Sequence, residues 1–221
     1  EENELVIFSS SFFDNFIGKW KYFSAIKRVD SLKSIFHGDV AIGEYVARRA
    51  GIGINAGSIR AQGSKVRSGE VVHTGVIPFF RKFQSTLHSC SQGGIRKGSA
   101  TLYFPWWHKE IEDVLVLKNN KGTDDNRVRH IDYAIQFDKM FYKRFIENGE
   151  ISLFSPNDVP GLYEAFGYND QFEELYVKYE KNKKIVRKTV KARDLMNTFA
   201  QERIGTGRMY VHNIDNTNTN S

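Results

Sequence analysis

The segment Ser89-Cys90-Ser91-Gln92-Gly93-Gly94-Ile95-Arg96-Lys97-Gly98-Ser99-Ala100-Thr101 places three glycines, two cations and several short polar side chains within thirteen residues. It leads into Thr101-Leu102-Tyr103-Phe104, a run typical of a strand, which Pro105 follows. The N–H groups of such a loop can surround an anion, and Arg96 and Lys97 add positive charge. We therefore predict a mobile loop that handles phosphates or nucleotide bases beside the end of a strand. A surface turn, with glycines needed only for positive φ, is the alternative.

Outward from this loop, helical and strand patterns alternate along the chain. Helices are predicted over residues 31–50, 74–88, 107–118, 137–148, 161–180 and 190–203. Strands are predicted over residues 51–57, 100–104, 131–136, 151–154 and 208–214, and residues 216–221 form a polar end without regular structure. This alternation indicates an α/β fold with parallel βα units, continuous over residues 30–215, in which ligands bind at strand ends.

The run Ala50-Gly51-Ile52-Gly53-Ile54-Asn55-Ala56-Gly57 satisfies a G-x-G-x-x-G/A pattern on paper. A dinucleotide site needs a strand before this pattern and a helix directly after it. Here a predicted helix precedes the run, and loop-like residues follow it. The sequence instead indicates a short buried strand whose glycines let a ligand or another backbone come close.

A polar loop over residues 58–70 carries Arg60, Lys65 and Arg67 together with two glycines. A guanidinium can hold two phosphate oxygens at once, so arginines on a loop suit a phosphate site. Plain solvated charge explains the composition of this loop equally well.

The bulk composition describes a globular protein with a moderate basic excess. The chain has 221 residues, 40% hydrophobic and 26% charged, and a net charge of +6. That excess permits a polyanionic partner but does not require one, and nucleic-acid binding would rest on it alone. No run is apolar enough to span a membrane, and the acidic start Glu-Glu-Asn-Glu is unlike a signal peptide. We expect a cytoplasmic protein.

Recognisable catalytic and metal-binding motifs are missing from the sequence. Cys90 is the single cysteine, so an intrachain disulfide and a cysteine-based metal site are excluded. The six histidines are scattered, and a packing role suits Cys90 better than a nucleophilic one. His108 and Glu110 are close in sequence, but on the predicted helix they would lie on different faces, which argues against a metal there.

Several long motifs carry a family resemblance. They are residues 50–67, His73-Thr74-Gly75-Val76-Ile77-Pro78-Phe79, Ser89 to Arg96, Leu115-Val116-Leu117-Lys118-Asn119-Asn120, Arg127-Val128-Arg129-His130-Ile131-Asp132-Tyr133, and Leu153-Phe154-Ser155-Pro156 through Asp158-Val159-Pro160-Gly161-Leu162-Tyr163. Together they resemble the large, catalytic subunit of class I ribonucleotide reductase, in its bacterial and T-even-phage branch. The resemblance runs from about Asp30 to Ser221, whereas residues 1–29 look divergent.

The resemblance implies a ten-stranded α/β barrel made of two parallel half-barrels. Residues 30–221 would form part of this barrel, namely most of its first half. A half-barrel alone would leave open edge strands, so the isolated chain is expected to aggregate or to fold only in part.

The resemblance also implies site residues, all of them for binding. The effector-binding set is Asp30, Ser31, Leu32, Arg60 and Arg67, with the two arginines on the effector phosphates. The substrate-binding set is Ala50, Gly51, Gln92 and Arg96. Gln92 and Arg96 would read the substrate base from the second specificity loop, and Cys90 at its start is not one of the redox cysteines.

The sequence departs from the family in its reactive residues. The family has a Phe-Ser-Ser-Cys strand before Asp-Ser-Leu, and an ungapped count puts Phe23 at that cysteine. Phe8-Ser9-Ser10-Ser11 echoes the motif at the wrong distance and without cysteine. The thiyl-radical cysteine and the second redox cysteine would lie beyond Ser221. No catalytic residue and no metal ligand is therefore expected in this chain, which reads as an internal fragment, inactive by itself.

The resemblance implies the partners of a complete reductase. The substrate would be a ribonucleoside diphosphate and the effector a deoxynucleoside triphosphate or ATP. This chain would bind no cofactor of its own, because a small, metal-containing subunit supplies the radical. A complementary large-subunit piece, thioredoxin or glutaredoxin, and a second copy in a homodimer complete the set, with no membrane and no nucleic acid. A non-catalytic nucleotide-binding remnant is the alternative.

Overall fold

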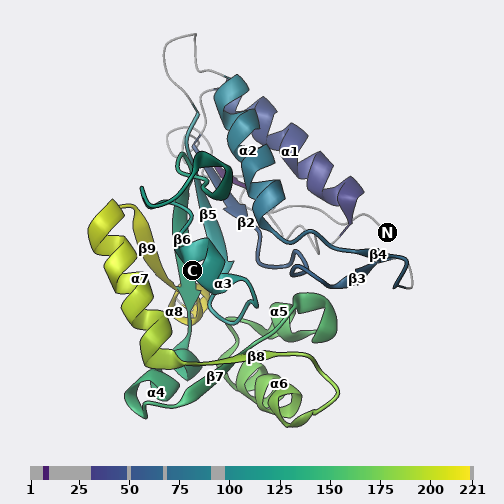
Figure 1. The fold of residues 1–221 in the computed structure, drawn as a ribbon, viewed down its shortest axis with the longest axis vertical. Coiled ribbons are helices and arrows are strands. Elements are labelled where there is room, and N and C mark those ends of the chain that lie inside the picture. Colours follow the sequence, from purple (N-terminus) through teal and green to yellow (C-terminus); the bar gives the residue numbers. More distant parts are fainter. Residues whose placement is uncertain (1–6, 10–30, 49–50, 67–68, 91–97, 220–221) are drawn as a thin grey trace.

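A mainly parallel sheet organises the computed structural model, which describes residues 7–9, 31–48, 51–66, 69–90 and 98–219. Its strands are β1 (Ile7–Ser9), β2 (Ile52–Asn55), β5 (Ala100–Pro105), β6 (Asp132–Phe137) and β9 (Met209–Asn213), in the order β1-β2-β5-β6-β9. The four strands from β2 to β9 run parallel, and β1 pairs antiparallel with β2 at the edge. This confirms the predicted α/β class with parallel pairing, as part of a barrel requires (Figure 1).

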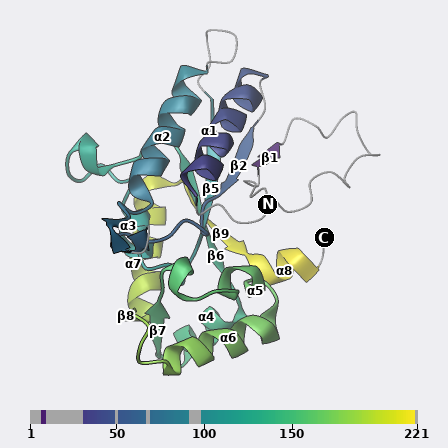
Figure 2. The same ribbon diagram turned by 90° about the vertical axis from the view of Figure 1, so that its right-hand side faces the viewer.

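Two long helices, α1 (Leu32–Ala47) and α2 (Ile77–Ser89), lie side by side next to β2 and β5 (Figures 1 and 2). Ser31 begins α1 as its N-cap, and its hydroxyl accepts a hydrogen bond from the Ser34 N–H at 3.2 Å. In α2, Pro78 occupies the first turn, where its missing N–H costs nothing. The inward faces at helical spacing bury Ile35, Ile42 and Val46 of α1 and Phe80, Phe83 and Leu87 of α2.

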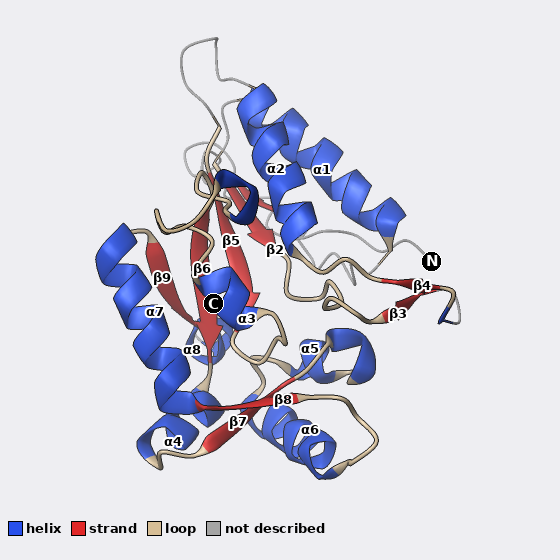
Figure 3. Ribbon diagram, in the orientation of Figure 1, coloured by secondary structure: helices blue, strands red, loops and turns tan. Residues whose placement is uncertain are grey.

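A second group of elements packs beyond the carboxyl ends of β5 and β6 (Figure 3). It contains the antiparallel pair β7 (Glu150–Leu153) and β8 (Lys188–Lys191), with α4 (Lys139–Ile146), α5 (Leu162–Ala165) and α6 (Asn169–Lys181), while α7 (Ala192–Thr206) leads from β8 along β9 (Figure 1). The remaining elements are the hairpin β3 (Lys65–Val66) and β4 (Val71–Val72), α3 (Ile111–Leu115), α8 (Ile214–Thr219), and the 3-10 turns Asp124–Asn126 and Pro156–Asp158.

An aromatic core joins the parallel sheet to this second group. Trp106 and Trp107 follow β5, and both are fully buried. Trp106 lies against Phe141 of α4 and Tyr176 of α6, with ring centroids 5.3 Å apart in each case. Its indole N–H donates to Asp138, the N-cap of α4, at 3.1 Å. The residues directly after β5 are therefore fixed by packing as well as by hydrogen bonds.

The structure corrects several sequence-based boundaries. The helix predicted over residues 107–118 is only Ile111–Leu115, because His108 pairs with Phe154 in an isolated bridge. Residues 190 and 191, predicted as the start of a helix, belong to β8 (Lys188–Lys191). The helix that follows, predicted to end at residue 203, ends at Thr206, with Gly207 as its C-cap at φ +67°. Residues 216–219, predicted to lack regular structure, belong to α8 (Ile214–Thr219).

Other expectations are confirmed. The run after residue 50 forms a short buried strand, preceded by a helix and followed by a loop, as the rejection of a dinucleotide site required. Within residues 1–29, the structure describes one short strand, β1. Among the described residues, no helix is long and apolar enough to cross a lipid bilayer.

Candidate functional site

The connections around β2 separate two candidate regions. Because α1 ends at Ala47 and β2 begins at Ile52, the C-terminus of α1 lies near the amino end of β2. The start of α1, with Ser31 and Leu32, therefore lies toward the carboxyl end of β2, where the loop bearing Arg60 begins (Figure 1). The predicted effector residues Ser31, Leu32 and Arg60 thus belong to the carboxyl-end side of β2.

We define the Arg60 loop as residues 56–64, which connect β2 to the β3–β4 hairpin. Ile59 and Ala61 are fully buried, while Arg60 between them is partly exposed. One guanidinium nitrogen of Arg60, Nη1, donates to the Lys65 carbonyl at 2.9 Å, which ties the side chain to β3. The loop thus keeps its apolar neighbours inside, while its one arginine stays partly exposed.

Three buried side chains from outside the loop hold its backbone. His108 Nε2 lies 2.8 Å from the Ile59 carbonyl oxygen, Ser155 Oγ accepts from the Ala61 N–H at 3.1 Å, and Glu110 Oε2 accepts from the Gln62 N–H at 3.0 Å. His108 and Glu110 follow β5, and Ser155 follows β7, so the group gathers just past the ends of two strands. We call His108, Glu110 and Ser155 the clasp.

Burial sets the ionisation of the clasp. Desolvation lowers the pKa of His108 to about 4, so its imidazole is neutral at pH 7. Nδ1 of this ring accepts the Glu110 N–H at 3.1 Å, so Nε2 carries the proton and donates to Ile59. Desolvation also raises the pKa of Glu110 to about 7, against the opposing effect of the backbone N–H groups of Gln62 and Val76.

Glycines let the loop approach its neighbours closely. A Cβ on Gly57 would lie 2.3 Å from Cδ of Pro105, the last residue of β5. Gly75 adopts φ +91°, and a Cβ there would lie 2.4 Å from Glu110 Oε1. Neither contact leaves room for a side chain, so these glycines fix the spacing between the loop, β5 and the clasp.

The second region lies at the amino end of the same strands. Gly51 directly precedes β2 and is half-buried, and Ile52 pairs in register with Ala100 of β5. A Cβ on Gly98 would lie 2.5 Å from Val46 Cγ1 and 2.8 Å from the Leu87 carbonyl oxygen. The ends of α1 and α2 therefore close tightly over the start of β5.

The structure places only some of the predicted site residues. Ser31, Leu32, Arg60 and Gly51 lie among the described residues. Outside the described residues fall the predicted effector residues Asp30 and Arg67 and the predicted substrate residues Ala50, Gln92 and Arg96. Cys90 is the C-cap of α2, and its Sγ lies 3.3 Å from the position a Cβ on Gly43 would take, a packing environment.

The clasp was missed at the level of sequence. The expectation that His108 and Glu110 lie on different helix faces was wrong, because residues 106–110 precede α3 and fold back on themselves. The only signal in the sequence was a histidine and a glutamate two residues apart, directly after two tryptophans. Within the described ranges, no three or more histidine, cysteine, aspartate or glutamate side chains gather in a way that could hold a metal ion.

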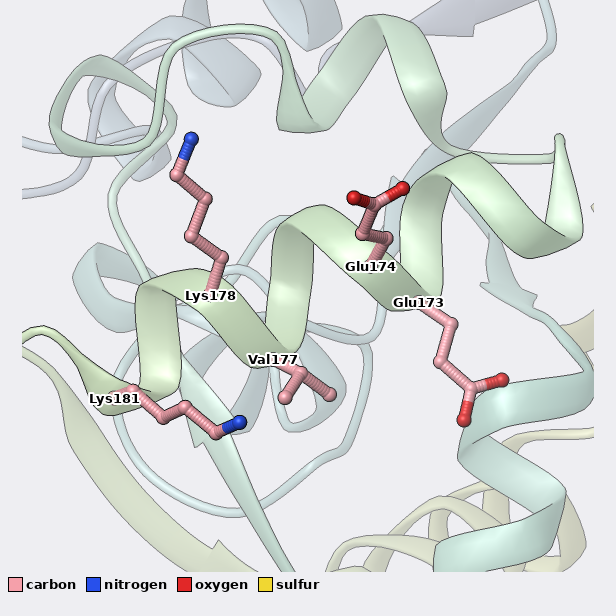
Figure 4. A pocket seen from close by; sticks show the side chains of 5 residues that line it. All are labelled: Glu173, Glu174, Val177, Lys178 and Lys181. Atoms are coloured by element: carbon pink, nitrogen blue, oxygen red, sulfur yellow. The ribbon is translucent and has the colours of Figure 1, made fainter.

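Two surface hollows lie elsewhere. One, of about 570 Å³, is lined by Glu173, Glu174, Val177, Lys178 and Lys181 of α6, and Figure 4 shows these side chains spread along a single helix. The other, of about 320 Å³, lies beside the end of α2 and is lined by Gln84, His88, Asp124, Arg127, Arg129 and His130. Asp124 pairs with Arg129 there, and both arginines donate through Nε to Asn119, so this hollow is braced by internal contacts.

Comparison with known proteins identifies the family. The sequence profile described as "Ribonucleotide reductase, barrel domain" matches residues 23–221. The chain is 58% identical over 193 residues to the ribonucleoside-diphosphate reductase subunit alpha of Haemophilus influenzae, covering 87% of this chain and 26% of that protein. It is 55% identical over 193 residues to subunit alpha of reductase 1 of Escherichia coli, covering 87% and 25%.

The corresponding subunit of Enterobacteria phage T4 is 53% identical over 195 residues, covering 87% of this chain and 26% of that protein. The chain thus spans about a quarter of the length of the curated relatives it matches. With a parallel α/β sheet and a profile match over most of its length, the chain belongs to the ribonucleotide reductase family and contains part of its barrel domain.

Proposed function

We propose that this chain contributes the effector-binding part of a ribonucleoside-diphosphate reductase, an oxidoreductase that converts ribonucleoside diphosphates to deoxyribonucleotides. The observation that carries the proposal is the Arg60 loop, whose only cation is partly exposed and tied to β3 while buried side chains hold its backbone. A guanidinium held in this way is ordered before a triphosphate arrives, so less freedom is lost on binding. The relatives named above are ribonucleoside-diphosphate reductases.

The effector in this proposal is a deoxynucleoside triphosphate or ATP. Arg60 and Arg67 bind its phosphates, and Asp30, Ser31 and Leu32 contact its ribose and base at the start of α1. Support comes from the topology, which directs the start of α1 and the Arg60 loop to the same end of β2. The positive end of the α1 dipole further favours a triphosphate at this end.

The substrate in this proposal lies toward the amino-end region. Ala50 and Gly51 contact it through their backbones, and Gln92 and Arg96 read its base. Support comes from the close approach of Gly98 to Val46 and Leu87, which brings the flanks of both segments together. Effector and substrate then lie at opposite ends of the same short strand pair, so occupancy of one can influence the other through β2 and β5.

The proposed enzyme acts as a homodimer, and α1 offers a surface for the contact. Leu32, Phe36 and Val40 are each four residues apart on α1, and between 46% and 60% of each is exposed. Such a row forms one apolar stripe along a helix. A second copy of this chain that covers the stripe would also border the start of α1, where the effector residues lie.

The chemical step in this proposal takes place in the complete reductase. There the remainder of the large subunit supplies the reacting cysteines, a small metal-containing subunit supplies the radical, and thioredoxin or glutaredoxin supplies electrons. The test is to mix this chain with a C-terminal large-subunit piece and the small subunit, and to measure deoxynucleotide formation. Activity that requires all three components is expected. Failure of every complete mixture to form deoxynucleotides would contradict the proposal.

The second candidate is a nucleotide-binding protein without a role in catalysis. It predicts that the chain binds deoxynucleoside triphosphates and never supports reduction in the mixture. The observation that favours it is that the hydrogen bonds that hold the Arg60 loop come from within this chain and involve no reactive cysteine. Nucleotide binding without reconstituted reduction would select this candidate.

A further inference from the structure

We propose that Glu110 is a positioning residue: its carboxylate holds the Arg60 loop in its nucleotide-binding shape, and proton uptake by this carboxylate weakens effector binding. The inference rests on the proposed effector role of the loop. It adds a residue that touches no nucleotide and acts through the backbone of the loop.

Both carboxylate oxygens of Glu110 accept backbone hydrogen bonds. The Gln62 N–H donates to Oε2 at 3.0 Å, and the Val76 N–H is shared between Oε1 at 3.3 Å and Oε2 at 3.2 Å. Gln62 lies near the end of the Arg60 loop, and Val76 is the N-cap of α2. The Glu110 carboxylate therefore links the two ends of the segment from Gln62 to Val76, which contains the β3–β4 hairpin.

A short ladder of backbone hydrogen bonds also joins the two ends of this segment. The Gly63 N–H donates to the His73 carbonyl, and the His73 N–H donates to the Ser64 carbonyl, both at 2.9 Å. The Ser64 hydroxyl in turn lies 2.8 Å from Ser155 Oγ. A shift of Gln62 away from Glu110 would thus move Arg60 on one side and the ladder on the other.

The position of Glu110 is itself fixed. Its N–H donates to Nδ1 of the neutral, fully buried His108, whose Nε2–H is bound to Ile59. Oε1 lies 2.4 Å from the position that a Cβ on Gly75 would take, so the carboxylate packs directly against the backbone of this glycine. The side chain is 6% exposed, so water cannot replace a lost protein contact cheaply.

The charge of Glu110 decides how well it can accept these bonds. An ionised carboxylate accepts through both oxygens, whereas a protonated one presents an O–H donor to N–H groups that need acceptors. The groups around it are His73, His108, Lys109 and Asp113; Lys109 favours the charged form and Asp113 opposes it. With burial raising the pKa of Glu110 to about 7, its charge changes within the neutral pH range.

The test compares Glu110→Gln with Glu112→Gln. Glu112 lies two residues further on and pairs with Lys188 at the surface, so the second variant makes the same chemical change without touching the loop. Binding of dATP to the full chain is measured by equilibrium dialysis at several pH values between 6 and 8. Amide hydrogen exchange at Gln62 and Val76 is followed without nucleotide, and circular dichroism checks that both variants fold.

Wild type and Glu112→Gln are expected to bind dATP about fivefold more weakly at pH 6 than at pH 8, following the ionisation of one group. Glu110→Gln is expected to bind roughly tenfold more weakly at pH 8, with a flat pH profile and faster exchange at both amides. If Glu110→Gln instead binds like Glu112→Gln with the same pH profile, the inference is overturned. A flat pH profile in wild type overturns it even if the Glu110 variant fails to fold.

An Arg60→Ala variant separates this inference from the proposed function. Loss of dATP binding in Arg60→Ala, with unchanged binding in Glu110→Gln, overturns only the role of Glu110. Absence of dATP binding in wild type contradicts the effector role of the loop, and the positioning role with it.

Discussion

The two ends of the β2–β5 pair are built on different principles. At the carboxyl end, the Arg60 loop is held by polar side chains that are buried and hydrogen-bonded, and one of them changes charge near neutral pH. At the amino end, α1, α2 and β5 meet where Gly98 has no side chain. The carboxyl end therefore combines close packing at Gly57 with a carboxylate whose charge changes near neutral pH, whereas the amino end relies on close packing at Gly98.

The largest expected effect is a loss of stability on adding a methyl group at either close approach. Gly98→Ala would press a Cβ against the Leu87 carbonyl and Val46, and Gly57→Ala would press one against the ring of Pro105. Each is expected to lower the free energy of unfolding by about 3 kcal/mol, as for overpacked cores. Urea denaturation measures the effect.

Gly205→Ala is the matched control, because a Cβ at this position in α7 meets nothing within 4 Å. It is expected to stabilise the chain by up to about 1 kcal/mol through helix propensity. Equal effects of Gly98→Ala and Gly205→Ala on the free energy of unfolding would contradict the close packing at the amino end.

The second prediction concerns the pH dependence of stability at the carboxyl end. Glu110 has a pKa of about 7 in the folded chain against 4.5 as its ordinary value, so its contribution is full below pH 4.5 and is lost as pH rises through 7. Relative to Glu110→Gln, wild type is therefore expected to lose roughly 2–3 kcal/mol between about pH 4.5 and pH 8. Unfolding curves for both chains across this range measure the difference.

Two other buried groups also change ionisation with pH, so the stability of wild type must be compared with that of Glu110→Gln. Asp138, with a pKa raised to about 7 by burial, acts with the same sign as Glu110. His108, with a pKa lowered to about 4, acts with the opposite sign, since its contribution is lost as pH falls below 6.5. A wild-type curve parallel to that of Glu110→Gln would show that Glu110 titrates normally.

A smaller effect is expected from Ser155→Ala, which removes one partner of Ala61 and of Ser64. The buried Ala61 N–H is left without its acceptor, at an expected cost of about 1–2 kcal/mol in unfolding free energy. Ser152→Ala is a fair control, because this serine is also buried but its backbone, rather than its hydroxyl, bonds Tyr176. Equal losses of unfolding free energy in the two variants would show that the Ser155 hydroxyl does not hold the Arg60 loop.

The smallest effect is expected on the outer face of α1 and α2. Lys82 lies over the Phe36 ring, 5.4 Å from its centroid, and pairs with Asp39 at 2.7 Å. Because Lys82 is exposed, Lys82→Ala is expected to cost less than about 1 kcal/mol. Phe36→Ser is expected to change stability little while lowering self-association, which analytical ultracentrifugation detects. Unchanged self-association would argue against α1 as the dimer surface.

Sequence reasoning predicted the periodic elements well. The apolar spacing in α1, the phenylalanines of α2 and the run Thr101–Phe104 each produced the element predicted, because burial on one face decides these structures. The parallel order followed from the alternation of strands and helices. β8 and α8 were missed, since both are polar and depend on contacts with β7 and with Lys139 that sequence does not display.

The candidate site was predicted unevenly for a physical reason. Arg60 could be proposed because a cation on a loop is a local feature of the sequence and the family resemblance assigned it to the effector phosphates. The clasp could not, because His108, Glu110 and Ser155 become neighbours only when the ends of β5 and β7 meet, and Ser155 is 94 residues from its partner Ala61. Local patterns reveal side chains that face solvent, but seldom those that support another segment from inside.

Titration of dATP into the full chain and its Arg60→Ala variant tests the central claim most directly, with Arg81→Ala on the exposed side of α2 as control. Saturable binding that is retained in Arg81→Ala and weakened at least tenfold in Arg60→Ala is the predicted result, as for a charge-assisted phosphate contact. Equal affinity in all three chains would contradict an effector site built on the Arg60 loop.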